Sequence, residues 1–165
     1  MLETSKEHEN KYPNTKSNTL IHIRRSDYLD TNEQLEISYY LKAIEYCSEK
    51  ITDFSYDIFT DDYEWVINQP IFNKANYVEK STNIEKRYKN DVLSTFINML
   101  DYENYIIANS TFSWWAAYLS RHPGKIVVAP ETWFGPEGPE TWGDMYCKGW
   151  TILPTYFDNG LIQPK

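Results

Sequence analysis

The apolar positions of this chain follow two alternating patterns, short apolar runs and longer stretches with helical periodicity. Short runs rich in β-branched and aromatic residues predict strands at residues 19–23, 56–60, 75–78, 105–108, 125–129 and 150–153. Apolar side chains that recur every three or four positions predict helices at residues 40–51, 65–67, 92–100, 112–119 and 141–147. Strands that alternate with helices in this way favour a sheet whose strands run parallel.

The predicted fold class is therefore α/β, with a Rossmann-like, mostly parallel sheet and helices on both faces. The run at 125–129 is almost continuously apolar, as in strands that helices cover on both sides. Residues 1–18 are rich in Lys, Glu, Asn and Ser, which predicts a poorly ordered leader or the remnant of a linker. Residues 19–165 are then expected to form a single domain.

Polar groups follow three of the predicted strands directly. These groups are Arg24, Arg25 and Asp27 after the first strand, Asp61 and Asp62 after the second, and residues 110–113 after the fourth. Because the carboxyl ends of parallel strands meet at one edge of a sheet, we expect all three groups to lie at that edge. Ligands of open α/β sheets bind at the same place.

Two of these groups are suited to phosphate. Arg24 and Arg25 each offer a planar fork of donors that keeps its charge, so together they suit a diphosphate. Ser110, Thr111 and Ser113 stand where a strand passes into a helix, and the free N–H groups and dipole of a helix N-terminus attract anions. The sequence therefore predicts a diphosphate site.

The neighbouring residues allow more than one role. His22 and Asp27 flank the arginines as groups for base recognition, orientation or proton transfer. Asp61, Asp62 or Asp91 would accept hydrogen bonds from a nucleobase or a ribose. The simpler interpretation makes the arginines and Asp27 a solvated ion cluster, and the other aspartates caps of the helices that follow them.

Composition limits the partners. The formal net charge of -8 argues against general nucleic-acid binding, so any phosphate site must be a local basic pocket. Cys47 and Cys147 are far apart and the three histidines are scattered, so neither a metal site nor a disulfide is expected, and a reducing cytoplasm is the expected compartment. No run is long and apolar enough for a transmembrane helix, and residues 1–18 are too polar for a signal peptide.

Motifs narrow the chemistry further. The chain has neither the G-x-G-x-x-G fingerprint of dinucleotide oxidoreductases nor the G-x-x-x-x-G-K-[ST] loop of P-loop NTPases. A Rossmann-like sheet with a diphosphate site and no fingerprint glycines favours an enzyme that uses a nucleotide sugar.

Four segments resemble one family in the same order. The sequence HIRRSDY at 22–28 is similar to the H-x-R-R-x-D-Y motif of the α-1,2-fucosyltransferases, glycosyltransferase family 11. FTDD at 59–62, followed by Trp65, resembles the family's F-S-D-D-x-x-W segment. IIANSTFSWWAA at 106–117 nearly matches a family block, and KIVVAP at 125–130 with Trp133 and Phe134 completes the order.

This resemblance implies the C-terminal, donor-binding half of a two-domain GT-B enzyme that needs no metal or other cofactor. The donor would be GDP-β-L-fucose, and L-fucose would pass to a glycan hydroxyl with inversion. Arg24 and Arg25 would hold the diphosphate, His22 would help to place the guanine side, and residues 110–113 would contact phosphate. Asp27 would orient Arg25 or act as general base, although a carboxylate beside an arginine is a poor proton acceptor.

The sequence departs from the family pattern in three places. Ser26 stands where the family usually has Gly, and Thr95 stands where it has an aspartate, with Asp91 one helical turn earlier. The family also carries a further N-terminal α/β domain that supplies much of the acceptor site. We therefore expect a nucleotide-sugar donor and a glycan acceptor as partners, with peripheral membrane association of the full enzyme and homo-oligomer formation as further expectations.

Two alternatives remain open at this point. The chain is either a catalytic donor domain or a binding module that recognises a GDP-sugar, or a glycan through Trp133, Trp142 and Trp150, without turnover. A related transferase for another GDP-hexose is the third reading, because the motifs specify the diphosphate contacts more firmly than the sugar.

Overall fold

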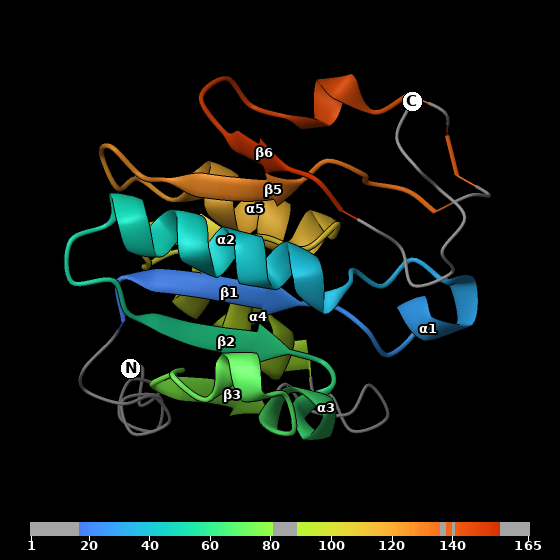
Figure 1. Cartoon of the computed structure of the whole chain (residues 1–165), viewed down its shortest axis with the longest axis horizontal. Helices are drawn as coiled ribbons and strands as arrows, with labels where there is room; N and C mark the ends of the chain where they lie inside the picture. The colour runs from blue at the N-terminus through green and yellow to red at the C-terminus, as the bar shows by residue number, and fades with distance from the viewer. Residues whose placement is uncertain (1–16, 81–88, 136–137, 140, 156–165) are drawn as a thin grey trace, which may run out of the picture.

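The computed structural model describes residues 17–80, 89–135, 138–139 and 141–155 (Figure 1). Within these residues the strands are β1 (Thr19–Ile23), β2 (Tyr56–Thr60), β3 (Tyr77–Lys80), β4 (Asn104–Ile106), β5 (Val127–Pro130) and β6 (Thr151–Leu153). The helices are α1 (Tyr28–Thr31), α2 (Ile37–Lys50), α3 (Tyr63–Ile67), α4 (Lys89–Met99) and α5 (Thr111–Leu119), with 3-10 turns at Pro70–Phe72 and Gly143–Met145.

The six described strands form one sheet in the order β3-β2-β1-β4-β5-β6, and every pair is parallel. The prediction of a Rossmann-like α/β fold is confirmed, and a sheet expected to be mostly parallel is parallel at each described pair. The chain winds outward from β1 to β3 and then restarts at β4 on the other side of β1. Such a switch point between β1 and β4 is where open α/β sheets bind ligands.

Helices cover both faces of the sheet, as the sequence predicts. Side chains alternate between the faces, so Ile21 and Ile23 pack with α2 and α3, whereas Leu20 packs with α4 and α5. Figure 1 shows α2 in front of the sheet and α4 and α5 behind it. All five residues of both β1 and β2 are buried, and this two-sided core fixes the strand ends that carry the polar groups.

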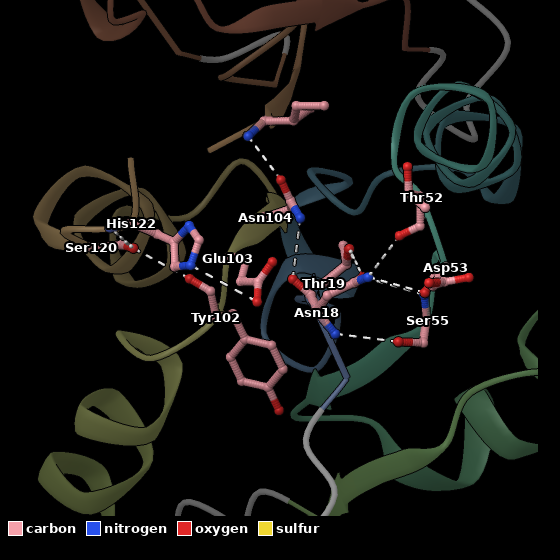
Figure 2. Close-up of polar contacts among 11 residues, drawn as sticks. Asn18, Thr19, Thr52, Asp53, Ser55, Tyr102, Glu103, Asn104, Ser120 and His122 are labelled. Atoms are coloured by element: carbon pink, nitrogen blue, oxygen red, sulfur yellow. Dashed lines mark hydrogen bonds and ion pairs between the residues drawn. The ribbon is translucent and has the colours of Figure 1, made fainter. Parts of the chain in front are cut away.

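The amino edge of the sheet is joined by polar contacts (Figure 2). The Asn104 side chain donates to the Asn18 carbonyl, with 3.3 Å between nitrogen and oxygen, and its Oδ1 accepts from the Ile126 N–H at 2.9 Å. Ser17 is buried and its hydroxyl donates to Asp57 Oδ1 at 2.7 Å. Ser17 and Asn18 are therefore part of the fold, although we assign residues 1–18 to a leader on composition; residues 1–16 lie outside the described residues.

Several element boundaries differ from the predicted ones. The third strand is Tyr77–Lys80 rather than 75–78, and the helix expected at 141–147 is a single 3-10 turn. Helix α4 includes Asp91 in its first turn, so Asp91 is not the residue that caps this helix. Helix α1 was not predicted because four residues are too few to show a period; it ends at Asn32, whose φ of 54° is a left-handed conformation that Asn tolerates.

Candidate functional site

The arginines and two aspartates meet because two neighbouring strands end together. β1 and β2 pair in a register that places Ile23 beside Thr60. The residues that follow each strand, Arg24 and Asp61, therefore leave the sheet side by side at its carboxyl edge. This edge borders the switch point, since β1 pairs with β4 on its other side.

Arg24 is held by two carboxylates. Its Nη2 lies 2.7 Å from Asp27 Oδ2, and its Nη1 lies 3.0 Å from Asp61 Oδ2. The guanidinium carbon also stands 5.5 Å from the centroid of the Tyr28 ring. Both terminal nitrogens of Arg24 thus already contact acids. Asp27 contacts Arg24 and not Arg25, the arginine that the sequence predicts it to orient, because the turn at 26–27 before α1 brings Asp27 back toward the earlier arginine.

Asp61 organises the loop that follows β1. Its side chain is only 6% exposed. Besides its ion pair with Arg24, it accepts hydrogen bonds from the Arg25 backbone N–H at 2.8 Å and from the Ser26 hydroxyl at 2.7 Å. Ser26 therefore has a specific partner at the position where the family usually has Gly. The predicted contact of Asp61 with a nucleobase stays a prediction; what the geometry shows is a carboxylate directed at the arginine loop.

Arg25 has a different environment from Arg24. Its Nε donates to Asp62 Oδ2 at 3.3 Å, and its guanidinium carbon lies 3.8 Å from the centroid of the Trp65 ring. Asp62 also caps α3, since its Oδ1 accepts from the Trp65 N–H at 3.2 Å. No described residue accepts a hydrogen bond from the two terminal nitrogens of Arg25. These nitrogens form the donor fork that an anion can use.

His22 lies in β1 beneath the arginines. It is buried, its ring centroid stands 6.1 Å from that of Phe112 in α5, and its Nδ1 has no hydrogen-bond partner among the described residues. Burial lowers the pKa of His22 from 6.5 to about 4, with Asp61 opposing this shift and Arg24 adding to it. His22 is therefore neutral at pH 7 and does not add to the positive charge.

The N-terminus of α5 is the second anion-binding feature. Ser110 is buried at the cap position, Thr111 is exposed, and Ser113 is fully buried with its hydroxyl donating to the Ser110 carbonyl at 3.3 Å. Within the described part of the chain, no residue accepts from the backbone N–H groups of residues 111–113. Ser113 can thus offer its N–H more readily than its hydroxyl.

Asn109 connects the loops around this helix, a role that we did not predict from the sequence. Its Nδ2 donates to the carbonyls of Glu33 and Trp133 at 2.9 and 3.2 Å, while its own carbonyl accepts from the Tyr28 hydroxyl at 3.1 Å. It thereby ties the loop after β1 to those after β4 and β5. The near-identical block at 106–117 contains Asn109, but only the three-dimensional loop positions reveal its partners.

The predicted residues thus gather in two groups at one edge. Contacts join Arg24, Arg25, Asp27, Asp61 and Asp62. His22 contacts the Phe112 ring of the turn at 110–113, and Asn109 before that turn binds the Tyr28 hydroxyl. Asp91 belongs to α4, and its side chain lies outside what the structure describes.

Among the described residues, no group of three or more His, Cys, Asp or Glu side chains is arranged to hold a metal ion. None of the described helices is both long and apolar enough to cross a membrane.

The strand order and the arginine site at its switch point define a Rossmann-like domain. The glycosyl transferase family 11 model matches residues 8–154, and the chain belongs to this family. The resemblance drawn from the sequence motifs is therefore confirmed.

Three relatives show what this chain is similar to. The chain is 39% identical over 123 residues to the O-antigen biosynthesis glycosyltransferase WbnK of Escherichia coli, covering 70% of this chain and 39% of the relative. It is 31% identical over 140 residues to an alpha-1,2-colitosyltransferase of E. coli, covering 74% and 45%. It is 26% identical over 110 residues to a galactoside 2-alpha-L-fucosyltransferase of Caenorhabditis elegans, covering 64% and 30%.

The matched region spans less than half the length of each of these relatives. No solved structure gives a significant match to the chain.

Proposed function

We propose that this chain is the donor-binding half of an inverting, metal-independent fucosyltransferase, which transfers L-fucose from GDP-β-L-fucose to a glycan hydroxyl. The observation that carries the proposal is the open donor fork of Arg25, which stands at the switch point with the N-terminus of α5. A nucleoside diphosphate matches both features, because one phosphate can use a bidentate guanidinium and the other a helix N-terminus.

The proposed chemistry is stabilisation of the leaving group. As the bond between fucose and the diphosphate breaks, negative charge grows on GDP, and Arg25 and the N–H groups of residues 111–113 would bind that charge where it develops. Asp27 is 54% exposed on the outer side of Arg24, so a phosphate can compete with it for the Arg24 guanidinium. Arg25 and the N–H groups of residues 111–113 would offset part of the charge on the diphosphate, and the proposal includes no divalent metal.

The α linkage supports inversion. Two relatives carry an alpha linkage in their names, and an α product from a β-linked donor requires inversion at the anomeric carbon. Asp27 Oδ2 contacts Arg24 Nη2 at 2.7 Å, which is the contact that this carboxylate makes in the structure. We therefore assign Asp27 to the orientation of Arg24.

A second donor sugar is a specific alternative. The relative that covers the largest share of this chain is named for colitose rather than fucose. The contacts that we propose for Arg25 and the N-terminus of α5 are with the diphosphate, so they suit either sugar. Comparison of GDP-fucose with GDP-colitose and GDP-mannose as donors distinguishes these cases.

We also retain the cytoplasm as the proposed compartment, because Cys47 and Cys147 are both free thiols.

A transfer assay on the full-length product of the encoding gene tests the proposed function. The assay supplies GDP-fucose and a galactoside acceptor with and without EDTA, and NMR of the anomeric proton identifies the linkage. We expect an α-fucoside in equal yield under both conditions. A β-linked product would contradict inversion, and loss of activity in EDTA would contradict metal independence. Binding of GDP-fucose without any transfer would support the alternative of a binding module.

A further inference from the structure

Arg25 lies between a carboxylate and an indole ring, and both come from the start of α3. Its Nε donates to Asp62, and the guanidinium carbon stands 3.8 Å from the Trp65 ring centroid. The Arg25 side chain is 11% exposed. A guanidinium this close to an aromatic face is attracted by the ring quadrupole, and the attraction is stronger where water is largely excluded.

The two contacts restrict the guanidinium in complementary ways. The hydrogen bond from Nε to Asp62 restrains the guanidinium at the nitrogen nearest the side-chain stem. The indole ring of Trp65 packs against the guanidinium and limits its rotation. The terminal nitrogens are left without an acceptor among the described residues. A flexible arginine would lose rotamer freedom on binding an anion, whereas a guanidinium held in advance loses less.

Trp65 is itself held in place. Its backbone N–H donates to Asp62 Oδ1 as the capping contact of α3, and its ring packs against Phe72 at a centroid distance of 6.2 Å. The same carboxylate therefore starts the helix that carries Trp65 and binds the arginine that rests on Trp65. This arrangement explains why the tryptophan stands three residues after the second aspartate.

We propose that Trp65 is a positioning residue for diphosphate binding, acting through Arg25. The inference rests on the proposed function, since it assumes that Arg25 binds the diphosphate of a GDP-linked donor. Trp65 supports the guanidinium plane so that the terminal nitrogens are held ready for phosphate oxygens. It has no contact with the reacting atoms in this account.

A double-mutant cycle tests this role. GDP and guanosine are titrated by calorimetry into the wild-type chain, Trp65→Leu, Trp65→Phe, Arg25→Ala and the double variant Trp65→Leu/Arg25→Ala. Ile67→Ala, an exposed position on the same helix, is the matched control. We expect Trp65→Leu to weaken GDP binding by about two- to tenfold, because Arg25 would then lose rotamer freedom when it binds phosphate. Trp65→Phe should restore part of the loss, and Ile67→Ala should match the wild type.

Coupling separates positioning from a general structural effect. In the Arg25→Ala background Trp65→Leu should cause no further loss of GDP affinity, because the residue through which it acts is absent. Guanosine, which has no phosphate, should bind the wild type and Trp65→Leu equally. GDP binding by Trp65→Leu at wild-type strength, or additive losses in the double variant, would overturn the inference while leaving the proposed function intact. Absence of GDP binding by the wild type would overturn the proposed function and this inference with it.

A second readout does not depend on ligand binding. A guanidinium over an indole ring experiences a ring-current shift, so the Arg25 Nε–H signal in proton–nitrogen NMR should move when Trp65 is replaced by Leu. The signal should stay in place in Ile67→Ala. An unchanged Arg25 signal in Trp65→Leu would contradict the contact between the two side chains.

Discussion

Asp61 forms an ion pair with Arg24, 3.0 Å between Oδ2 and Nη1, because their strands end at the same level of the sheet, where Ile23 pairs with Thr60. The carboxylate also accepts from the Arg25 backbone and the Ser26 hydroxyl, so a single side chain from β2 fixes the loop after β1.

Replacement of Asp61 should destabilise the fold. Asp61→Ala leaves the Arg25 N–H without its acceptor and removes one of the two acids at Arg24, so we expect the free energy of unfolding to fall by about 1–3 kcal/mol. Urea denaturation followed by circular dichroism measures the change. Asp30→Ala in the exposed part of α1 is the control and should have little effect. Equal stability of the two variants would show that the Asp61 contacts contribute nothing.

The amino edge should affect stability without affecting the site. Asn104→Ala removes the side-chain contacts to Asn18 and to the N–H of Ile126 (Figure 2). Asn104 begins β4 and Asn18 precedes β1, whereas the arginines follow the carboxyl end of β1. We expect a loss of about 1–3 kcal/mol in unfolding free energy. The GDP affinity of the folded variant, measured by calorimetry, should equal that of the wild type. A lower affinity would mean that the two edges are coupled.

His22 should make stability depend on pH. Its folded pKa of about 4 lies below its ordinary value of 6.5, so the unfolded chain binds a proton more readily than the folded chain between these two values. The stability associated with neutral His22 is thus complete above pH 6.5 and is lost as pH falls toward 4. The full effect is about 3 kcal/mol.

The variant His22→Gln isolates this contribution. Denaturation midpoints of the wild type and the variant are compared at pH 7 and pH 4.5. The wild type should lose more unfolding free energy than His22→Gln over this range, because the carboxylates that titrate are the same in both chains. An identical loss in the two proteins would show that His22 does not carry the predicted shift.

The sequence predicts some parts of this molecule well for physical reasons. The bounds of β1 and β2 agree with the prediction, because β-branched and aromatic residues are frequent in both strands and polar residues flank them. β3 was misplaced by two residues because it stands at the edge of the sheet, where burial constrains the pattern less. α1 and the turn at Gly143–Met145 are too short to show a period.

The site shows the same limit. The positions of charged residues at the predicted strand ends were enough to predict that His22, both arginines and two aspartates lie at one edge of the sheet. The pairing of each arginine with its acid depends on the register of β1 with β2 and on the turn at α1, which no local pattern reveals. The contact between Arg25 and Trp65 also requires the position of α3 against the sheet. Asp62 caps α3, as the simpler interpretation predicts, and it also accepts from Arg25, while its contact with a nucleobase or ribose stays a prediction.

The central claim is that Arg25 supplies the open donor fork for a diphosphate, while both terminal nitrogens of Arg24 are engaged by acids. The most direct test is calorimetric titration of GDP into the wild type, Arg25→Ala and Arg24→Ala, each first shown to be folded. We expect saturable binding by the wild type, a loss of about ten- to hundredfold in Arg25→Ala, and a smaller loss in Arg24→Ala. Binding that is unchanged in Arg25→Ala, or a wild type that does not bind GDP, would contradict the account.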